Sequence, residues 1–494
     1  MSGVTDVPAL VVFVAVFVLV AALGFVAARW RRPATLAHLD EWGLGGRQFG
    51  TWITWFLVGG DFYTAYTVIA VPAAVYAAGA YGFFALPYTI IVYPVVFAIM
   101  PRLWTVAARG GYVTAADVVL GRWSSRPLEL AVAATGVLAT MPYIALQLVG
   151  MAVVIKALGL PAELSLGVAF LVLAVFTYSS GLRAPALIAF VKDAMIYIVV
   201  LAAVVVVPLR LGGYGHMFEA ANAVYLTKGG ATGLVLKPAQ MLPYATLALG
   251  SALAAFMYPH TLTGVFAAKS ADTIRKNAVL LPIYTLLLGL IALLGYMAHA
   301  AGIKVADKND AVPALFAAVF PGWFAGFAFA AIAVGALVPA AVMSIGAANL
   351  FTRNFWKAYV NPAVTSAGEA NVAKITSLLV KLGALLVIVY VPTEYALDLQ
   401  LLGGLWILQT FPSVVFGLFR IPGLHRLSAS GLLAGWAAGM VLGTVLIAGD
   451  GFKPLHAVAD GVVIYTGLLA IVANVLVAAA VSAFAPKPTE AFAD

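Results

Sequence analysis

The sequence predicts an all-α integral membrane protein, and three observations support this fold class. The chain of 494 residues is 64% apolar and only 9% charged, with a mean hydropathy of +1.05, whereas a soluble domain is about a quarter charged. Its apolar residues form runs long enough to cross a bilayer as helices. No segment shows the alternating pattern of an outer-membrane barrel. The lipid bilayer is therefore the first predicted partner of the chain.

Runs of roughly 20 apolar residues predict about thirteen transmembrane helices. In chain order they cover residues 7–28, 51–76, 82–100, 128–157, 162–180, 186–208, 240–266, 278–300, 324–350, 374–392, 398–418, 428–447 and 461–484. The first run is too long for the apolar part of a signal peptide and follows no cations, so we interpret it as a retained helix. Residues 1–494 then form a single transmembrane domain.

The lysines and arginines between these runs predict the orientation, because cytoplasmic loops carry an excess of both residues. Most of them fall in cytoplasmic loops if the N-terminus lies outside, and an odd number of helices then puts the C-terminus in the cytoplasm. The net charge of +8 is spread over short loops, which does not indicate a nucleic-acid partner. The absence of cysteine excludes disulfides and thiolate catalysis, and the histidines show no spacing typical of a metal site.

Two of the predicted helices are interrupted near their middle. Gly59, Gly60 and Asp61 interrupt one, and Pro259, which lacks an amide hydrogen and disfavours helix at Tyr258, interrupts another. Corresponding interruptions in two halves of a membrane protein indicate an inverted repeat with its binding site at the breaks.

The spacing of the two breaks predicts how the repeat is divided. They lie five helices apart, and five is odd, so the second half enters the membrane from the opposite side. We expect a first repeat over 51–208 and an inverted second repeat over 240–418. The helix at 7–28 and two helices within 428–484 are then extra elements outside this five-plus-five arrangement.

Three stretches resemble the sodium:solute symporter family. They are LGGRQFGTWITWFLVGGDFYTAYTVIAVPAAVYAAG from residue 44, YSSGLRAPALIAFVKDAMIYIV from residue 178 and PAAVMSIGAANLFTRNFWKAYV from residue 339. Within the family, the first and third are most similar to the bacterial monocarboxylate permeases. The resemblance extends over nearly the whole chain and implies a leucine-transporter-type fold with an external N-terminus.

The resemblance also implies a function. We expect a secondary active symporter, not an enzyme, that takes up a small monocarboxylate such as acetate, propionate, pyruvate or lactate. It would work by alternating access in the bacterial cytoplasmic (inner) membrane, as a monomer, with H⁺ or Na⁺ as the coupling ion and no cofactor. The alternatives are a symporter for another small solute (an amino acid, a vitamin or urea) and a transporter-like sensor. The short stretch after Phe484 argues against the sensor.

A cation site follows from the resemblance position by position. The family's sodium site maps onto the backbone oxygens of Gly60, Tyr63 and Ala341 and the hydroxyl of Ser344, and oxygen is the ligand that hard cations prefer. Its last ligand maps onto Ile345, whose side chain has no oxygen, so a sodium site is weakened here. Asp61 is the additional candidate, since an acid inside a membrane helix indicates function. Capping of the broken helix is the alternative role for Asp61.

Polar side chains near the breaks are the candidates for substrate binding, because helix N-termini offer amide donors to an anion. They are Thr64, Tyr66, Thr67, Tyr143, Gln147, Tyr258, His260, Thr261, Trp406 and Gln409. The alternative for each is an ordinary hydrogen bond between packed helices.

Three further charges fall within the predicted helices. We expect the lysines 192 and 381 to extend toward the cytoplasmic headgroups, as long cationic side chains near helix ends commonly do. Asp193 is expected to contribute to ion release on the inner side or to pair with Arg183 or Lys192.

Overall fold

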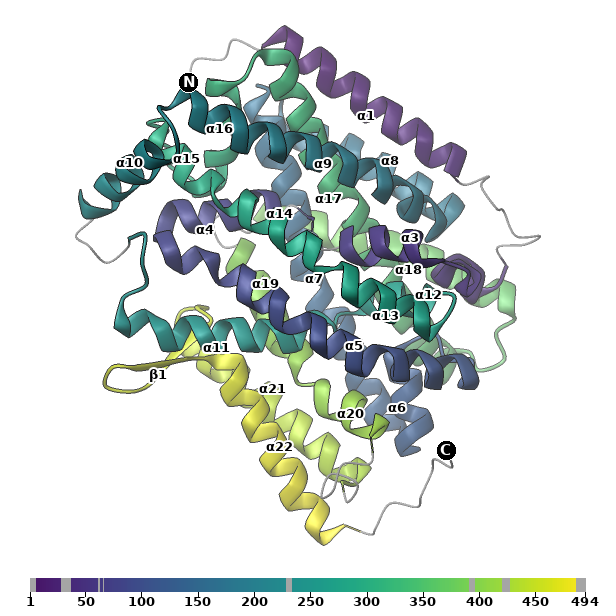
Figure 1. Ribbon diagram of the computed structural model, residues 1–494. Helices are drawn as coiled ribbons and strands as arrows, with labels where there is room; N and C mark the ends of the chain where they lie inside the picture. Colours follow the sequence, from purple (N-terminus) through teal and green to yellow (C-terminus); the bar gives the residue numbers. More distant parts are fainter. Residues whose placement is uncertain are drawn as a thin grey trace.

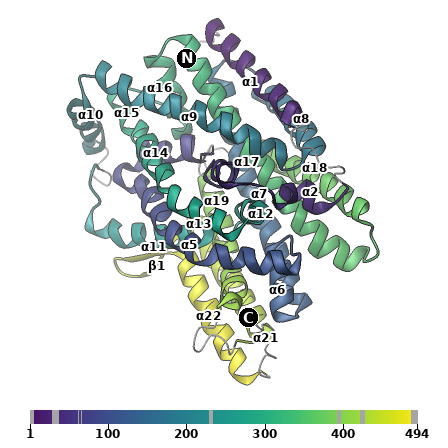
Figure 2. The same ribbon diagram turned by 45° about the vertical axis from the view of Figure 1, so that its right-hand side comes forward.

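A computed structural model describes residues 6–27, 37–60, 63–64, 66–227, 233–390, 396–419 and 427–485. Within these ranges the chain is a bundle of helices with one short antiparallel hairpin (Figure 1). Helix α1 lies along one edge of the bundle beside α8, and α21 and α22 project together from the opposite side in both views (Figures 1 and 2).

The first half of the chain contains fourteen helical elements in the described residues. They are α1 (Val7–Ala27), α2 (Leu39–Leu44), η1 (Gly45–Arg47), α3 (Thr51–Thr54), η2 (Trp55–Gly59), η4 (Tyr66–Ala70), α4 (Val71–Ala78), η5 (Gly79–Phe84), α5 (Ala85–Gly110), α6 (Ala115–Trp123), α7 (Arg126–Ala157), α8 (Ala162–Ser180), α9 (Arg183–Arg210) and α10 (Tyr214–Thr227). Both η2 and η4 are π-helical turns, which occur frequently at functional sites.

The second half ends in the hairpin and a final helix. Its elements are α11 (Pro238–Ala255), α12 (Pro259–Ala267), α13 (Ala271–Leu280), α14 (Pro282–Ala292), α15 (Leu294–Ala300), η6 (Lys308–Asp310), α16 (Ala311–Val319), α17 (Gly322–Phe351), η7 (Thr352–Val360), α18 (Ser366–Tyr390), α19 (Ala396–Leu408), α20 (Phe411–Val415), η9 (Phe416–Leu418), α21 (Ala429–Gly449), β1 (Leu455–Ala459), β2 (Val462–Tyr465) and α22 (Thr466–Phe484).

In the described residues, each predicted transmembrane range overlaps one helix or a series of consecutive helical elements. Among the described residues, 8 stretches are long and apolar enough to cross a membrane, and two bent pairs raise this number to 10. The total of thirteen therefore stays a prediction. The range 461–484 is wrong at its start, because residues 462–465 form β2 and pair with β1.

Helices α7 and α17 lie at the centre of the bundle and position the site. The most apolar window of α17 is 100% buried, and that of α7 is 83% buried. The window of α17 is therefore covered on all sides, as expected of a helix that is apolar all round, and α7 is covered over most of its surface, with Leu138 exposed. The corresponding windows of α1, α21 and α22 are only 22%, 33% and 28% buried, which leaves their apolar faces for lipid.

Candidate substrate and cation sites

The break between α11 and α12 is a sharp bend of 48°. Tyr258 has an extended backbone (φ −62°, ψ 140°) and precedes α12, whose first residue is Pro259. Proline suits this position because the first amides of a helix have no partner within the helix. The amides of His260 and Thr261 are in the same first turn, where backbone N–H groups make no hydrogen bond within the helix itself.

A cavity lies at this bend and collects five of the ten predicted substrate residues. Its volume is about 550 Å³ with the opening included. The five predicted residues are Tyr66, Tyr143, Tyr258, His260 and Thr261, and the sequence did not indicate Tyr88, Ser251, Gln400 or Tyr465, which also line it. The apolar part of the wall comes from Ala254, Ala255 and Leu401.

Aromatic rings from two helices and the bend pack against one another in the wall of the cavity. The ring of Tyr143 on α7 lies 5.3 Å from the rings of both Tyr258 and His260, and these two rings are 5.2 Å apart. The Tyr258 hydroxyl donates to the Gln400 carbonyl at 3.3 Å. In this way α7, the bend and α19 are joined around a wall rich in hydroxyl groups and aromatic edges.

The cavity has the chemistry of a site for a small, partly apolar solute with a polar end. Hydroxyl groups, an imidazole and first-turn amides offer hydrogen-bond donors, while alanine and leucine offer an apolar surface. The described lining residues include no lysine or arginine. An anion bound here is therefore stabilised by dipoles and hydrogen bonds rather than by a formal positive charge.

The other five predicted substrate residues do not line this cavity. Trp406 donates to Thr444 on α21 at 3.0 Å, and the Gln409 side chain is bonded by Asn474 on α22 at 3.2 Å. Both therefore face the C-terminal helices.

The remaining three predicted substrate residues lie on or beside the first break and α7. The Thr64 hydroxyl accepts the Tyr66 amide at 3.0 Å, which caps the start of η4. Gln147 donates to the backbone oxygen of Tyr143 at 3.3 Å, and Thr67 is buried in η4.

At the first break, the backbone oxygens predicted to hold a cation bind a lysine. The ammonium of Lys192 on α9 donates to the carbonyl of Gly60 and, at 3.0 Å, to that of Tyr63. It also lies 2.9 Å from Asp193 Oδ1. The predicted pairing of Asp193 with Lys192 is confirmed, while Arg183 pairs with Glu41 at 2.9 Å instead.

The second half of the predicted cation site, on α17, has different partners. The Ser344 hydroxyl donates to the Ala341 carbonyl at 2.7 Å and lies 3.1 Å from the Ser377 hydroxyl. Lys381 in turn donates to Ser377 at 2.8 Å. Ile345, the residue without an oxygen, is fully buried on the same helix. Asp61 lies outside the described residues.

The prediction that both lysines extend to the headgroups is wrong. Lys192 and Lys381 are 0% and 1% exposed. The reason is that buried oxygens receive their ammonium groups, which offsets the cost of removing them from water. For Lys192 these oxygens belong to the distant Gly60 and Tyr63, and for Lys381 the oxygen is that of Ser377, one turn earlier in α18.

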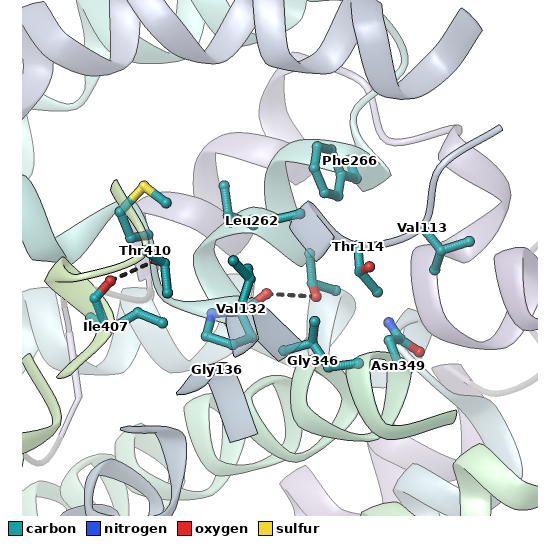
Figure 3. A pocket seen from close by; sticks show the side chains of 15 residues that line it. Val113, Thr114, Val132, Gly136, Leu262, Phe266, Gly346, Asn349, Ile407 and Thr410 are labelled. Carbon is teal, nitrogen blue, oxygen red and sulfur yellow. Dashed lines mark hydrogen bonds between the residues drawn. The ribbon is translucent and has the colours of Figure 1, made fainter. Parts of the chain in front are cut away.

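A second cavity lies on the other side of the α11–α12 bend (Figure 3). Pro259 belongs to its wall, whereas the neighbouring Tyr258 and His260 face the first cavity. The second cavity is largely apolar, and Thr114 and Asn349 lie together at one end of it (Figure 3). The bend is thus a wall shared by two cavities.

A buried polar network closes the end of the second cavity. Thr114 donates to Asn354 at 2.8 Å, and the Asn354 amide donates to Asp117 at 2.7 Å and to Glu129 at 2.8 Å. Burial raises the pKa of the Asp117 carboxyl, while nearby Arg353 and the hydrogen bonds to Asp117 act in the opposite direction. The network joins α6, α7 and η7 on the side predicted to be cytoplasmic.

Similarity to known proteins extends over most of the chain. The sodium:solute symporter family matches residues 42–439. A Rhizobium johnstonii protein named monocarboxylate transport permease protein is 68% identical over 481 residues, which cover 97% of each chain. The uncharacterized symporter YodF of Bacillus subtilis is 34% identical over 443 residues, covering 88% of this chain and 87% of YodF.

A solved structure shares the fold. The substrate-bound, outward-open state of a Na⁺-coupled sialic acid symporter superposes with a TM-score of 0.78 at 14% identity, covering 99% of this chain and 100% of that one. Identity this low shows the fold alone, and it confirms the predicted class of all-α membrane protein with a leucine-transporter-type architecture. The helices and the broken pairs are those of a multi-pass membrane protein. The match over residues 42–439 and the 68% identical relative show that this protein belongs to the sodium:solute symporter family.

Proposed function

We propose that this symporter takes up a small monocarboxylate, such as acetate, propionate, pyruvate or lactate, together with a cation across the bacterial inner membrane. The observation that carries the proposal is the cavity at the α11–α12 bend, whose lining combines the first turn of α12 and several tyrosines with alanine and leucine side chains. A short carboxylic acid has the same division into an anionic end and an apolar end. The name of the 68% identical relative supports this substrate class.

In this proposal the carboxylate binds at the start of α12. The amides of His260 and Thr261 and the hydroxyl of Tyr143 are its donors, and Tyr66 completes this side of the cavity. The Tyr258 hydroxyl would exchange its bond to the Gln400 carbonyl for one to the carboxylate. Hydrogen bonds to a charged group contribute about 1.5–3 kcal/mol each, so a few of them are enough to hold a small anion without a lysine or arginine.

Alternating access follows from the two cavities that share the bend. The first cavity includes Tyr465, beside a loop predicted to be external, and the second ends at the network around Asn354 on the predicted cytoplasmic side. Rocking of the first repeat (51–208) against the second (240–418) would open one cavity at a time to water. The N-terminus is outside and the C-terminus inside in this scheme, and one monomer is the functional unit.

The experiment is uptake of labelled acetate, propionate, pyruvate and lactate into proteoliposomes that contain the purified chain. Sodium and proton gradients are imposed separately. We expect saturable uptake of at least one acid and competition among them. Tyr143→Phe should raise KM by about tenfold, the effect of losing one hydrogen bond to an anion. Tyr178→Phe, a change on an exposed tyrosine of α8, is the control and should leave uptake unchanged.

Absence of uptake of all four acids, with uptake of an amino acid, a vitamin or urea instead, would contradict the proposal. Unchanged kinetics in both Tyr143→Phe and Tyr258→Phe would keep the substrate class but move its binding site away from the bend.

A further inference from the structure

Lys192 and Asp193 form an ion pair that the binding of a monocarboxylate does not require. Both side chains are 0% exposed, and both lie inside α9, which is long and apolar enough to cross the membrane. A charge in this position is costly and indicates a function. The pair is at the break between η2 and η4, not among the residues that line the substrate cavity.

The surroundings of Lys192 are those of a bound monovalent cation. Its ammonium contacts the carbonyls of Gly60 and Tyr63 and the carboxylate of Asp193. An ammonium has three N–H groups, and three oxygens face it. The other carboxylate oxygen of Asp193 accepts the Tyr284 hydroxyl at 2.7 Å, which fixes the carboxylate that balances the charge.

The two glycines of the break make this arrangement sterically possible. A β-carbon at Gly60 would lie 3.1 Å from Lys192 Nζ and 3.0 Å from Asp193 Oδ2. A β-carbon at Gly59 would lie 2.2 Å from the ring of Tyr284, so a side chain at either position would displace the pair or the tyrosine that orients it. The break thus lets a cationic side chain reach the carbonyls of Gly60 and Tyr63, although the Gly60 carbonyl also accepts the Tyr63 amide at 3.1 Å.

We propose that the ammonium of Lys192 is a built-in replacement for the sodium ion expected at Gly60 and Tyr63, so that this carrier works without sodium at that position. The inference refines the proposed function by naming the group that specifies which ion the carrier needs. A sodium ion about 4 Å from the ammonium would be bound about a thousandfold more weakly because of repulsion, at the effective dielectric typical of proteins.

The remaining ligands expected for sodium are also committed elsewhere or missing. Ser344 donates to Ala341, and Ser377 links Ser344 to the second buried lysine, Lys381. A β-carbon at Gly335 would lie 3.9 Å from the Tyr63 carbonyl. The Tyr63 carbonyl therefore lies near Gly335 on α17, which is six residues, or about 9 Å along the helix, before the expected ligand Ala341. The residues present therefore do not fit a sodium ion, and they do fit a lysine.

Two measurements on the purified full-length protein test the proposal. The first is uptake of labelled acetate into proteoliposomes at one pH, in sodium or in choline medium. We expect the wild-type rates to differ by less than about threefold, and a larger stimulation by sodium would overturn the inference. The second is equilibrium binding of radioactive sodium to protein in detergent, where we expect no saturable binding to the wild type. Saturable wild-type binding that Lys192→Met does not increase would also overturn it.

The Lys192→Met variant removes the ammonium and keeps the length of the side chain. In sodium-free medium its uptake should fall at least about tenfold, because Asp193 is left buried without its partner. Sodium should restore part of the uptake, since the carbonyls of Gly60 and Tyr63 then no longer bind an ammonium. Sodium-free uptake that stays within about threefold of the wild type would overturn the inference. Lys276→Met removes an exposed lysine of α13 and is the matched control.

Ile345→Thr tests the proposal independently, in case the Lys192→Met variant does not fold. It adds a hydroxyl to the expected sodium shell but leaves the ammonium in place, so we expect no sodium stimulation. Stimulation of this variant by more than about threefold would show that the lysine does not exclude sodium. Sodium binding is measured without any substrate, so an absence of acetate uptake would count against the proposed function and leave the binding test of Lys192 intact.

Discussion

Replacement of Gly60 by alanine tests whether the Lys192–Asp193 pair matters for transport. Gly60 has φ −63° and ψ −17°, values that any residue adopts, so alanine introduces no backbone strain. The added β-carbon would instead approach Asp193 Oδ2 to 3.0 Å and Lys192 Nζ to 3.1 Å. Both distances are shorter than ordinary contacts with a carbon atom, and the pair must therefore shift away from the break.

The expected cost follows from the contacts that shift. Loss of one charge-assisted hydrogen bond costs about 1.5–3 kcal/mol. Replacing a helical glycine by alanine stabilises the helix by about 0.5–1 kcal/mol. The net loss is about 1–2 kcal/mol, or about 5- to 30-fold in an equilibrium constant. If only one conformation of the transport cycle holds the pair in this way, uptake should fall by the same factor.

The assay is the initial rate of acetate uptake, normalised to folded protein in the membrane. Gly167→Ala in α8 is the matched control, because a β-carbon there meets no atom within 4 Å. We expect uptake by the control to equal that of the wild type and uptake by Gly60→Ala to be much lower. Equal rates in the two variants would refute the reasoning, since they would show that the pair tolerates displacement.

Two further predictions concern the polar network at the end of the second cavity and the orientation of the chain in the membrane. Asn354→Leu should destabilise the network by about 2–4 kcal/mol, because Asp117 and Glu129 each lose a buried donor. The readouts are a lower melting temperature and faster labelling of a cysteine introduced at position 349. An unchanged melting temperature would contradict the prediction. Single cysteines at the exposed residues Arg109 and Asn222 should react with impermeant reagents from the cytoplasm and from outside, respectively. The reverse pattern would contradict the external N-terminus.

Local chemistry explains why the helices and their breaks were predictable from the sequence. A run of about 20 apolar residues can satisfy its backbone in lipid only as a helix. Pro259 bends the chain because it lacks an amide hydrogen, and this holds in any surroundings. The cavity at this bend therefore appeared where the sequence placed it, with Tyr258, His260 and Thr261 in its wall.

Long-range packing explains what the sequence could not predict. The carbonyl that receives Lys192 belongs to a residue 132 positions earlier, and only the folded bundle brings the two together. The direction of Gln409 depends in the same way on α22, whose Asn474 binds it. The adjacent Lys-Asp pair inside an apolar run was the one sequence signal for the buried ion pair, because two opposite charges there are best explained by mutual neutralisation.

The hairpin between α21 and α22 has a consequence for how substrate preference evolves in this family. Tyr465, the last residue of β2, lines the proposed substrate cavity, and its hydroxyl donates to the Leu401 carbonyl at 3.4 Å. This residue follows both proposed repeats in the chain, so the hairpin can vary in length and composition without disturbing their pseudosymmetry. Carriers that prefer longer or bulkier acids are expected to differ here first. Exchange of residues 455–465 between two such carriers should transfer part of the preference while leaving ion dependence unchanged.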